Sequence, residues 1–183
     1  MTVLALGANV AGRWGGPRET IARAVGLLAQ SGARAPVQGP LYRSRPVGSI
    51  RQAEYLNTIV ACRWAETPLR ILQRCKLIEA AAGRRSGPRW GPRCLDIDII
   101  MTRGIQNAFR RPEGPVNRAG YRPRCVVLPH PEFHRRAFVL QPLAEVAPRL
   151  VHPVLGLTVR QMLERLPARH RHGLRRMSAT TIG

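Results

Sequence analysis

The sequence predicts a single-domain α+β fold, and three observations support this prediction. The chain has 183 residues, enough for one well-developed hydrophobic core but too few for two. Short apolar runs rich in β-branched residues alternate with two amphipathic helical patterns. No apolar run approaches the roughly 18 residues that a membrane-spanning helix needs. We therefore expect one sheet covered by helices, and no membrane partner.

The first part of the chain predicts two strands separated by a helix. The apolar residues 2–6 indicate a buried strand that ends in a tight turn at residues 7–9. A helix is expected to begin near Pro17, with apolar residues at helical spacing until residues 31–32. Residues 36–45 are typical of an irregular second strand.

The next part completes a βαββαβ order. Residues 55–64 are β-branched enough to predict a third strand. Thr67 followed by Pro68 predicts a helix N-cap with proline in the first turn, and the helix continues to Gly83. After a Gly/Pro-rich loop, a strand is expected over 94–101. Because two helices that alternate with strand pairs must cover one face of the sheet, this order predicts a ferredoxin-like arrangement.

The remaining residues predict extra C-terminal strand and helix elements. Residues 103–124 are polar and basic and indicate a long loop insertion. A short strand is expected within 126–128 and a last helix within 157–166. We expect residues 1–167 to form the domain and residues 168–183 to form a basic, solvated and flexible tail.

The net charge of +20 raises the question of a nucleic-acid partner. All but one of the 30 basic residues are Arg, and Gly and Pro are also abundant, which is the pattern of a GC-rich coding bias. No basic stretch is interleaved with aromatic residues as in binders of single-stranded nucleic acid. We expect no nucleic-acid partner, and a basic nucleic-acid-binding module stays the alternative function. The four widely spaced Cys predict reduced thiols in the cytoplasm.

Asp96 and Asp98 are the only two Asp in the chain and lie two residues apart on a predicted strand. Side chains at this spacing leave the same face, while the residues between and around them point into the core. Such a pair can form ion pairs with arginines, or it can bind Mg²⁺, which completes its shell with water and phosphate oxygens. The preceding loop supplies arginines suited to phosphate: Arg84, Arg85, Arg89 and Arg93. Together these residues predict phosphoryl transfer, and the missing G-x-x-x-x-G-K pattern argues against a P-loop enzyme.

Several ordered motifs span most of the chain. The most specific is Arg89-Trp-Gly-Pro-Arg-Cys-Leu-Asp-Ile-Asp98. The others are Leu4-Ala-Leu-Gly-Ala-Asn9, Leu41-Tyr-Arg-Ser-Arg-Pro-Val-Gly48, Tyr55-Leu-Asn57, Leu128-Pro-His-Pro131, Arg136-Ala-Phe-Val-Leu140 and Pro142-Leu-Ala-Glu-Val-Ala-Pro148. Over residues 2–165 the chain resembles the 6-hydroxymethyl-7,8-dihydropterin pyrophosphokinase family. The resemblance implies transfer of pyrophosphate from ATP to the hydroxymethyl group of a reduced pterin, with AMP as the other product, in folate biosynthesis.

The resemblance also implies a role for each motif. Asp96 and Asp98 would hold two Mg²⁺ ions that bridge the triphosphate, and Arg84 and Arg93 would stabilise charge on the transferred group. The pterin would be bound by Ser44, Val47, Tyr55, Asn57 and Phe138. The nucleotide would be bound by Lys76, Glu79, Arg84, Arg89, Arg93, Ile99, His130 and Arg136. For Gly7 and Asn9, a tight turn explains the residues as well as a ligand contact does.

The sequence departs from the family pattern in three places. The usual Gly-Arg-x-Arg ends in Ser86, so Arg85 or Arg89 would have to replace the second arginine. Lys76 stands where some members have a Gln that helps to bind nucleotide, and the segment 103–124 is longer than the family predicts. These departures leave open a degenerate relative that binds pterin and ATP but transfers slowly.

Two segments are expected to act as lids, and the remaining expectations concern partners. The lids would be residues 48–54 and 84–92, which are rich in Gly and Pro and lie beside the predicted site. The expected ligands are ATP, Mg²⁺ and a reduced pterin. By resemblance, we expect a monomer whose neighbours in metabolism are other folate-pathway enzymes.

Overall fold

The computed structural model describes residues 1–46, 51–85, 91–104, 107–108 and 126–178. Its strands are β1 (Thr2–Ala8), β2 (Arg34–Gln38), β3 (Tyr42–Ser44), β4 (Tyr55–Arg63), β5 (Asp96–Thr102), β6 (Asn107–Ala108), β7 (Val127–Leu128) and β8 (Arg175–Arg176). Its helices are α1 (Pro17–Gln30), α2 (Pro68–Ala81), the 3₁₀ helix η1 (Phe133–Arg135), α3 (Ala137–Val146), α4 (Val159–Glu164) and α5 (Ala168–Arg171).

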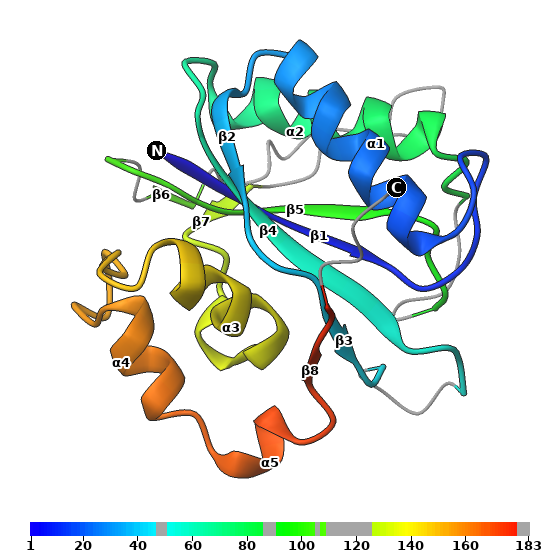
Figure 1. Cartoon of the computed structure of the whole chain (residues 1–183). Coiled ribbons are helices and arrows are strands. Elements are labelled where there is room, and N and C mark those ends of the chain that lie inside the picture. Colours follow the sequence, from blue (N-terminus) through cyan, green and yellow to red (C-terminus); the bar gives the residue numbers. More distant parts are fainter. Residues whose placement is uncertain (47–50, 86–90, 105–106, 109–125, 179–183) are drawn as a thin grey trace, which may run out of the picture.

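The main sheet is antiparallel, and its order confirms the predicted fold class. β1 lies between β4 and β5, both β2 and β3 pair with β4, and β8 pairs with β3. With β2 and β3 taken as one interrupted strand, this is the order of a ferredoxin-like βαββαβ core. α1 and α2 cover one face of the sheet, and α3 and α4 lie on the other (Figure 1).

The irregular strand expected over residues 36–45 is two strands, β2 and β3. Pro40 lies between them and has no N–H to donate to a ladder. The amide of Gly39 donates to the Ile59 carbonyl at 2.9 Å, which keeps the connection close to β4. Within β2, Ala35 has a φ of 46°, in the left-handed region, so the strand is bent as well as short.

The helix ends follow the signals in the sequence. α1 begins at Pro17 and ends at Gln30, and Gly32 beyond it has a φ of 114° that a glycine adopts freely. The predicted N-cap of α2 is present, because the Thr67 hydroxyl accepts a hydrogen bond from the Arg70 amide at 3.5 Å. Both helices therefore run between local start and stop signals.

The side chains of β1 alternate between two hydrophobic layers. Leu4 and Leu6 pack in the layer under α1 and α2, while Val3 packs in the layer under α3 and α4. On the α3 face the β1 side chains shrink from Val3 to Ala5 to Gly7. This layer is filled at the Val3 end and opens into a cavity at the Gly7 end.

The C-terminal segment is largely exposed, as the sequence predicts, but its described part includes a strand where a flexible tail was expected. Arg175 and Arg176 form β8 beside β3, and the amide of Met177 donates to the Leu41 carbonyl at 2.8 Å. The side chain of Met177 packs against the core. Composition predicted a tail without regular structure because Arg and His dominate this segment. However, the edge of β3 offers backbone donors and acceptors that a strand of any composition can satisfy.

Part of the predicted insertion at 103–124 and the last residues lie outside the described part of the chain. The short strand expected within 126–128 is present as β7, which pairs with β6 from the described part of the insertion. Residues 179–183 are not among those described, and a domain boundary at residue 167 stays a prediction. None of the described helices is long and apolar enough to cross a membrane.

A buried histidine supports the loop before α4. His152 is 5% exposed, and its ring stacks on Phe133 with centroids 5.0 Å apart. Its Nδ1 accepts hydrogen bonds from the amides of Val154 and Leu155 at 3.1 and 3.2 Å. His134 meets the ring edge-on at 6.1 Å. Burial, and then His134, lower the pKa of His152 from 6.5.

We expect this histidine to make folding stability depend on pH. The unfolded chain binds a proton at His152 more tightly than the folded chain, so the free energy of unfolding should fall as the pH drops below 6.5 toward the lowered pKa. His152→Asn keeps an acceptor near Nδ1 and should flatten this dependence. Urea unfolding on both sides of pH 6.5 measures it, with the exposed His172→Asn as control. An unchanged pH dependence in His152→Asn contradicts the prediction.

Candidate active site

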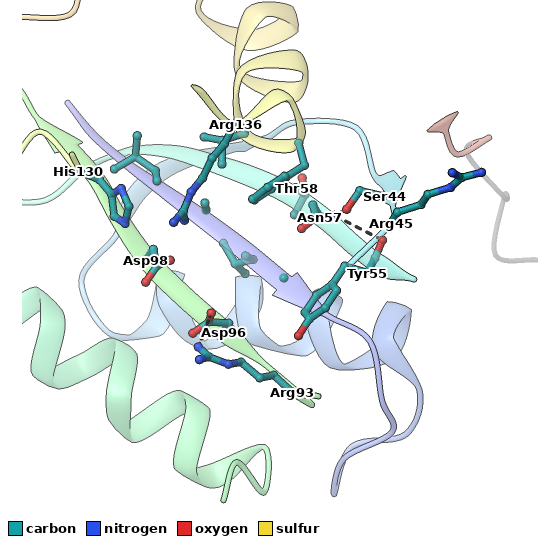
Figure 2. Close-up of a pocket in the computed structure, with 16 residues that line it drawn as sticks. Ser44, Arg45, Tyr55, Asn57, Thr58, Arg93, Asp96, Asp98, His130 and Arg136 are labelled. Carbon is teal, nitrogen blue, oxygen red and sulfur yellow. Dashed lines mark hydrogen bonds and ion pairs between the residues drawn. The ribbon is translucent and has the colours of Figure 1, made fainter. Parts of the chain in front are cut away.

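Side chains predicted to bind ligands meet in a cavity of about 310 Å³ on the α3 face of the sheet (Figure 2). Four of the residues predicted to bind the pterin line it: Ser44, Tyr55, Asn57 and Phe138. Five of those predicted to bind metal or phosphate line it as well: Arg93, Asp96, Asp98, His130 and Arg136. Strands β3, β4 and β5 therefore bring together residues that are far apart in the sequence.

Gly7 makes room for this cavity in the middle of the sheet. It lies in β1, paired with Asn57 of β4 on one side and with Asp96 of β5 on the other. A Cβ atom at Gly7 would lie 3.3 Å from Asn57 Oδ1 and 3.8 Å from the Tyr55 ring. Because Gly7 has no side chain, space is left between the Asn57 amide and the Asp96 carboxylate. A tight turn by itself would not require this space.

The polar edge of the cavity is held in a fixed orientation. Asn57 is buried, and its Nδ2 donates to Ser44 Oγ at 2.9 Å. The Tyr55 hydroxyl donates to the Gly91 carbonyl at 2.9 Å, which ties the ring to the loop before β5. Burial raises the pKa of Tyr55, so the hydroxyl stays protonated. Amide and aromatic ring are both placed before any ligand binds.

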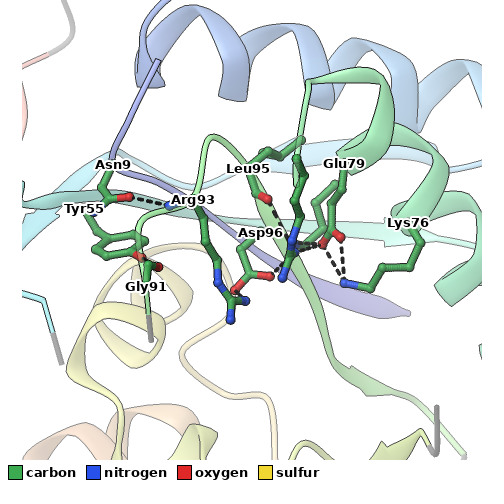
Figure 3. A network of polar contacts seen from close by, with 10 residues as sticks. Asn9, Tyr55, Lys76, Glu79, Gly91, Arg93, Leu95 and Asp96 are labelled. Atoms are coloured by element: carbon green, nitrogen blue, oxygen red, sulfur yellow. Dashed lines mark hydrogen bonds and ion pairs between the residues drawn. The ribbon is translucent and has the colours of Figure 1, made fainter. Parts of the chain in front are cut away.

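Asn9 joins three segments at the rim of the site. Its Oδ1 accepts a hydrogen bond from the backbone amide of Arg93 at 2.8 Å, and its backbone amide donates to the Arg93 carbonyl at 2.9 Å (Figure 3). Its Nδ2 donates to Gln52 Oε1 and to the Ala53 carbonyl, both at 3.0 Å. Asn9 therefore anchors the described end of the first expected lid, and it also holds Arg93, the residue that follows the second. Residues 48–50 and 86–90 of these lids lie outside the described residues.

Asp96 is held between two arginines. Arg84 donates to its Oδ1, and Arg93 Nη1 donates to its Oδ2 at 2.7 Å (Figure 3). Burial alone would raise the pKa of Asp96, but the two guanidinium groups hold it below its usual value. Arg84 also contacts Glu79 Oε1 at 2.7 Å. The two functions considered for this pair, ion pairing with arginines and binding of Mg²⁺, therefore both involve the Asp96 carboxylate.

Glu79 links α2 to β5 from behind the site. Its carboxylate is 2% exposed, accepts from the Ile97 amide at 2.7 Å, and receives Lys76 Nζ at 2.7 and 2.8 Å. Burial raises the pKa of Glu79, and Lys76 and Arg84 oppose this shift. It lines neither described cavity, so its predicted nucleotide contact stays a prediction.

A second cavity of about 290 Å³ lies next to the first. Its walls are mostly apolar, with Leu72 and Lys76 from α2 and Ile99 from β5. Asp98 and His130 line both cavities. Two separate spaces for ligands thus meet at one carboxylate and one imidazole.

The groups at this junction are free to contact ligands. His130 Nδ1 accepts the Glu132 amide at 3.2 Å, so the proton of the neutral ring is on Nε2. Burial lowers the pKa of His130, although Asp98 opposes the shift, so the neutral ring is favoured. Among the described residues, none donates a hydrogen bond to the Asp98 carboxylate or forms an ion pair with it.

Asp96 and Asp98 fit the needs of Mg²⁺ better than those of zinc. In the described part of the chain, no group of three or more His, Cys, Asp or Glu could hold a metal. Mg²⁺ is usually bound through one or two carboxylates, with water and substrate phosphates completing six oxygen ligands. Structural or catalytic zinc would need three or four protein ligands.

Some predicted residues are not in the cavities. Val47 and Arg89 lie outside the described residues, as does Ser86. Arg84 lines neither cavity in this structure but reaches Asp96 directly. Arg85, considered as a replacement for a family arginine, has an exposed side chain.

A model of the 7,8-dihydro-6-hydroxymethylpterin-pyrophosphokinase family matches residues 3–148. The chain belongs to this family. It is 40% identical, over 89% of its length and 91% of the relative, to the 2-amino-4-hydroxy-6-hydroxymethyldihydropteridine pyrophosphokinase of Methylorubrum extorquens. It is 35% identical to the enzymes of that name from Pseudomonas aeruginosa, over 90% of this chain and 95% of the relative, and Bacillus subtilis, over 78% and 75%.

Solved structures show the same fold. A crystal structure of wild-type Plasmodium falciparum HPPK-DHPS with SDX-DHP matches with a TM-score of 0.71 at 15% identity. The match covers 96% of this chain and 46% of that one, so this family member spans about half the length of that protein. The pyrophosphokinase family assignment rests on the sequence relatives, and the structural match supports the fold.

Sequence reasoning missed several residues that line the first cavity of this pyrophosphokinase family member. Ala5 lies opposite Asp98 in the sheet, and Arg45, Thr58 and Ile100 are further parts of the wall. The falling size of side chains along β1, from Val3 through Ala5, was a usable signal. Arg45 and Thr58 gave no such signal, because their approach to the cavity depends on how β3 and β4 pair.

Proposed function

We propose that the protein transfers pyrophosphate from ATP to the hydroxymethyl oxygen of 6-hydroxymethyl-7,8-dihydropterin, giving the pterin diphosphate and AMP in folate biosynthesis. Family membership supports the identity of the substrates. The observation that carries the proposal is that two cavities meet at Asp98 and His130. A reaction between two substrates needs two spaces that join where the chemistry takes place.

The first cavity suits the pterin. Tyr55 and Phe138 offer flat surfaces for a heteroaromatic ring, and Asn57 and Ser44 offer donors and acceptors for its mixed edge. Val47 is proposed to join them, as the resemblance implies. Arg136, whose guanidinium carbon lies 5.9 Å from the Phe138 ring centroid, brings positive charge to the same wall.

The second cavity suits the nucleotide. Its apolar wall at Leu72 and Ile99 fits a purine base, and Lys76 adds a positive charge at its side. A triphosphate that leaves this cavity toward Asp98 and His130 would come within reach of Arg93 and Arg136, which line the first cavity. We propose that Arg84 and Arg89 add to this positive charge. Arg84 would do so after its ion pair with Asp96 is broken. Glu79 would act on the nucleotide through Lys76.

Asp96 and Asp98 are proposed to hold two Mg²⁺ ions. When bound, the ions would neutralise phosphate charge and orient the triphosphate. The carboxylates leave the same face of β5, toward the junction of the cavities. In this structure Arg84 and Arg93 form ion pairs with Asp96. When Asp96 binds the ions instead, both arginines can pair with the phosphates.

The reaction needs positioning more than covalent chemistry. The pterin hydroxyl oxygen forms a bond to the β-phosphorus, and the bond from that phosphorus to the oxygen shared with the α-phosphate breaks. AMP leaves with the electron pair of the broken bond, and the hydroxyl proton passes to solvent. Asn57 and the two aromatic residues place the hydroxyl, while Arg84 and Arg93 stabilise the charge on the transferred group. His130 Nε2–H is free to donate to a phosphate oxygen.

The product distinguishes this reaction from its alternatives. We expect pterin-dependent AMP from ATP, Mg²⁺ and the hydroxymethyl pterin, with no ADP, measured by nucleotide chromatography. ADP instead of AMP would make the protein a simple kinase. Binding of both ligands without AMP would indicate the degenerate relative, and salt-sensitive oligonucleotide binding without pterin binding would favour the nucleic-acid module. The monomeric state, the cytoplasmic location and the folate-pathway neighbours stay predictions.

A further inference from the structure

The C-terminal strand lies at the edge of the sheet that carries the pterin side of the site. β8 pairs with β3, so that Arg176 is opposite Tyr42 and Arg175 is opposite Arg43 (Figure 1). The next residue of β3 is Ser44, which lines the first cavity. A segment more than a hundred residues later in the chain thus lies one strand away from the pterin residues.

Arg175 reaches the start of β4. Its Nη2 lies 2.9 and 3.1 Å from the two carboxylate oxygens of Glu54. Arg43 Nη1 approaches the same carboxylate at 3.9 Å. Glu54 immediately precedes Tyr55, whose ring lines the first cavity. Arg175 therefore holds the chain where one aromatic wall of the cavity begins.

Arg176 reaches the helix that carries the other aromatic wall. Its Nη2 lies 3.1 Å from Glu145 Oε2 on α3. The second oxygen of Glu145 accepts the hydroxyl of Tyr42, which is buried. Phe138 lies in the first turn of the same helix. Arg176 and Tyr42 together hold α3 against β3.

The turn before β8 also contacts the rim of the cavity. A Cβ atom at Gly173 would lie 3.1 Å from Arg45 Nε and 3.2 Å from two carbons of the same side chain. Arg45 lines the first cavity and extends from the end of β3 toward the C-terminal segment (Figure 2). Of the residues that the segment 173–176 approaches, Arg45 lines the cavity, and Glu54 and Glu145 belong to the segments that carry Tyr55 and Phe138.

We propose that residues 173–177 form a clasp that sets the width of the pterin cavity, with Arg175 and Arg176 as positioning residues. The clasp holds Tyr55 through Glu54 and Phe138 through Glu145, so that both rings keep the spacing a flat ligand needs. This inference rests on the proposed function. Because both arginines are more than half exposed, their ion pairs add little to global stability. Their loss should affect the spacing of the walls more than folding.

The test is the double variant Arg175→Ala/Arg176→Ala in the full chain. Steady-state kinetics and pterin fluorescence titration should give a pterin KM and Kd raised about fivefold or more, because small misplacements of binding groups are costly. The KM for ATP should stay within about twofold, and Tm should change little. The matched control is Arg169→Ala/Arg171→Ala, which removes the same charge from exposed positions of α5.

A second variant tests whether restoring the two ion pairs also restores the pterin site. Arg175→Lys/Arg176→Lys keeps both positive charges and should restore most of the pterin affinity. The clasp is wrong if the alanine variant keeps wild-type pterin KM and Kd, or if pterin KM, ATP KM and Tm all change together. Failure of the proposed function has a different signature, because the wild type itself would then form no pterin-dependent AMP.

Discussion

Asp98→Asn should lower kcat for AMP formation by at least about a thousandfold, and Asp96→Asn should do the same. Each substitution removes one of the two carboxylates that line the first cavity while keeping the shape of the side chain. An amide cannot supply the negative charge that a divalent cation needs, and the triphosphate would be held without its counter-charge. Product formation is measured by nucleotide chromatography across a range of Mg²⁺ concentrations.

The two variants differ in a way that tests the site further. Asp98 has no described ion-pair partner, so Asp98→Asn should leave Tm nearly unchanged. Asp96→Asn also removes the partner of Arg84 and Arg93, so it should lower Tm as well as activity. Glu164→Gln, an exposed carboxylate on α4, is the control for a change of one charge. Wild-type turnover in either Asp variant would contradict the metal site.

Glu79→Ala should lower the free energy of unfolding by about 3–5 kcal/mol. The variant leaves Lys76 and Arg84 without their shared carboxylate and the Ile97 amide without its acceptor. Removing one partner from a buried ion pair costs far more than removing an exposed one, because the remaining charges stay away from water. Urea denaturation followed by circular dichroism measures the difference.

Two further variants show which part of Glu79 is needed. Glu79→Gln can still accept the Ile97 amide and should lose less stability than Glu79→Ala. Glu66→Ala breaks the Glu66–Arg74 pair, which is partly exposed at 3.4 Å, and should cost less than about 1 kcal/mol. Equal losses in Glu79→Ala and Glu66→Ala would show that the buried network contributes no more than a surface pair.

Local patterns predicted much of the fold because each depends on neighbours in sequence. The N-cap at Thr67 and the stop at Gly32 need only a few adjacent residues, so both were visible without the structure. Residues 137–146 were harder, because an apolar run with an internal Pro142 is typical of neither a clean helix nor a strand. Packing of this segment against the sheet makes it α3.

In the candidate site, too, some features could be predicted from the sequence and others depend on tertiary packing. The placement of Asp96 and Asp98 on one face follows from the strand period of two, and their proposed role as a metal pair was inferred from their chemistry. The burial of Glu79 behind β5 could not be predicted, because its contact with the Ile97 amide depends on how α2 packs on the sheet. Lys76 is likewise paired with Glu79, a contact that its position in the family motif did not indicate.

The sequence by itself determined the βαββαβ order of the core, the face on which the two Asp lie and the family to which the motifs belong. Those features follow from spacing along the chain and from residue chemistry. Only the tertiary structure decided that two cavities share Asp98 and His130, and that Arg175 and Arg176 pair with Glu54 and Glu145. These contacts join residues far apart in the chain, and they exist only because the order of strands in the sheet brings distant segments side by side.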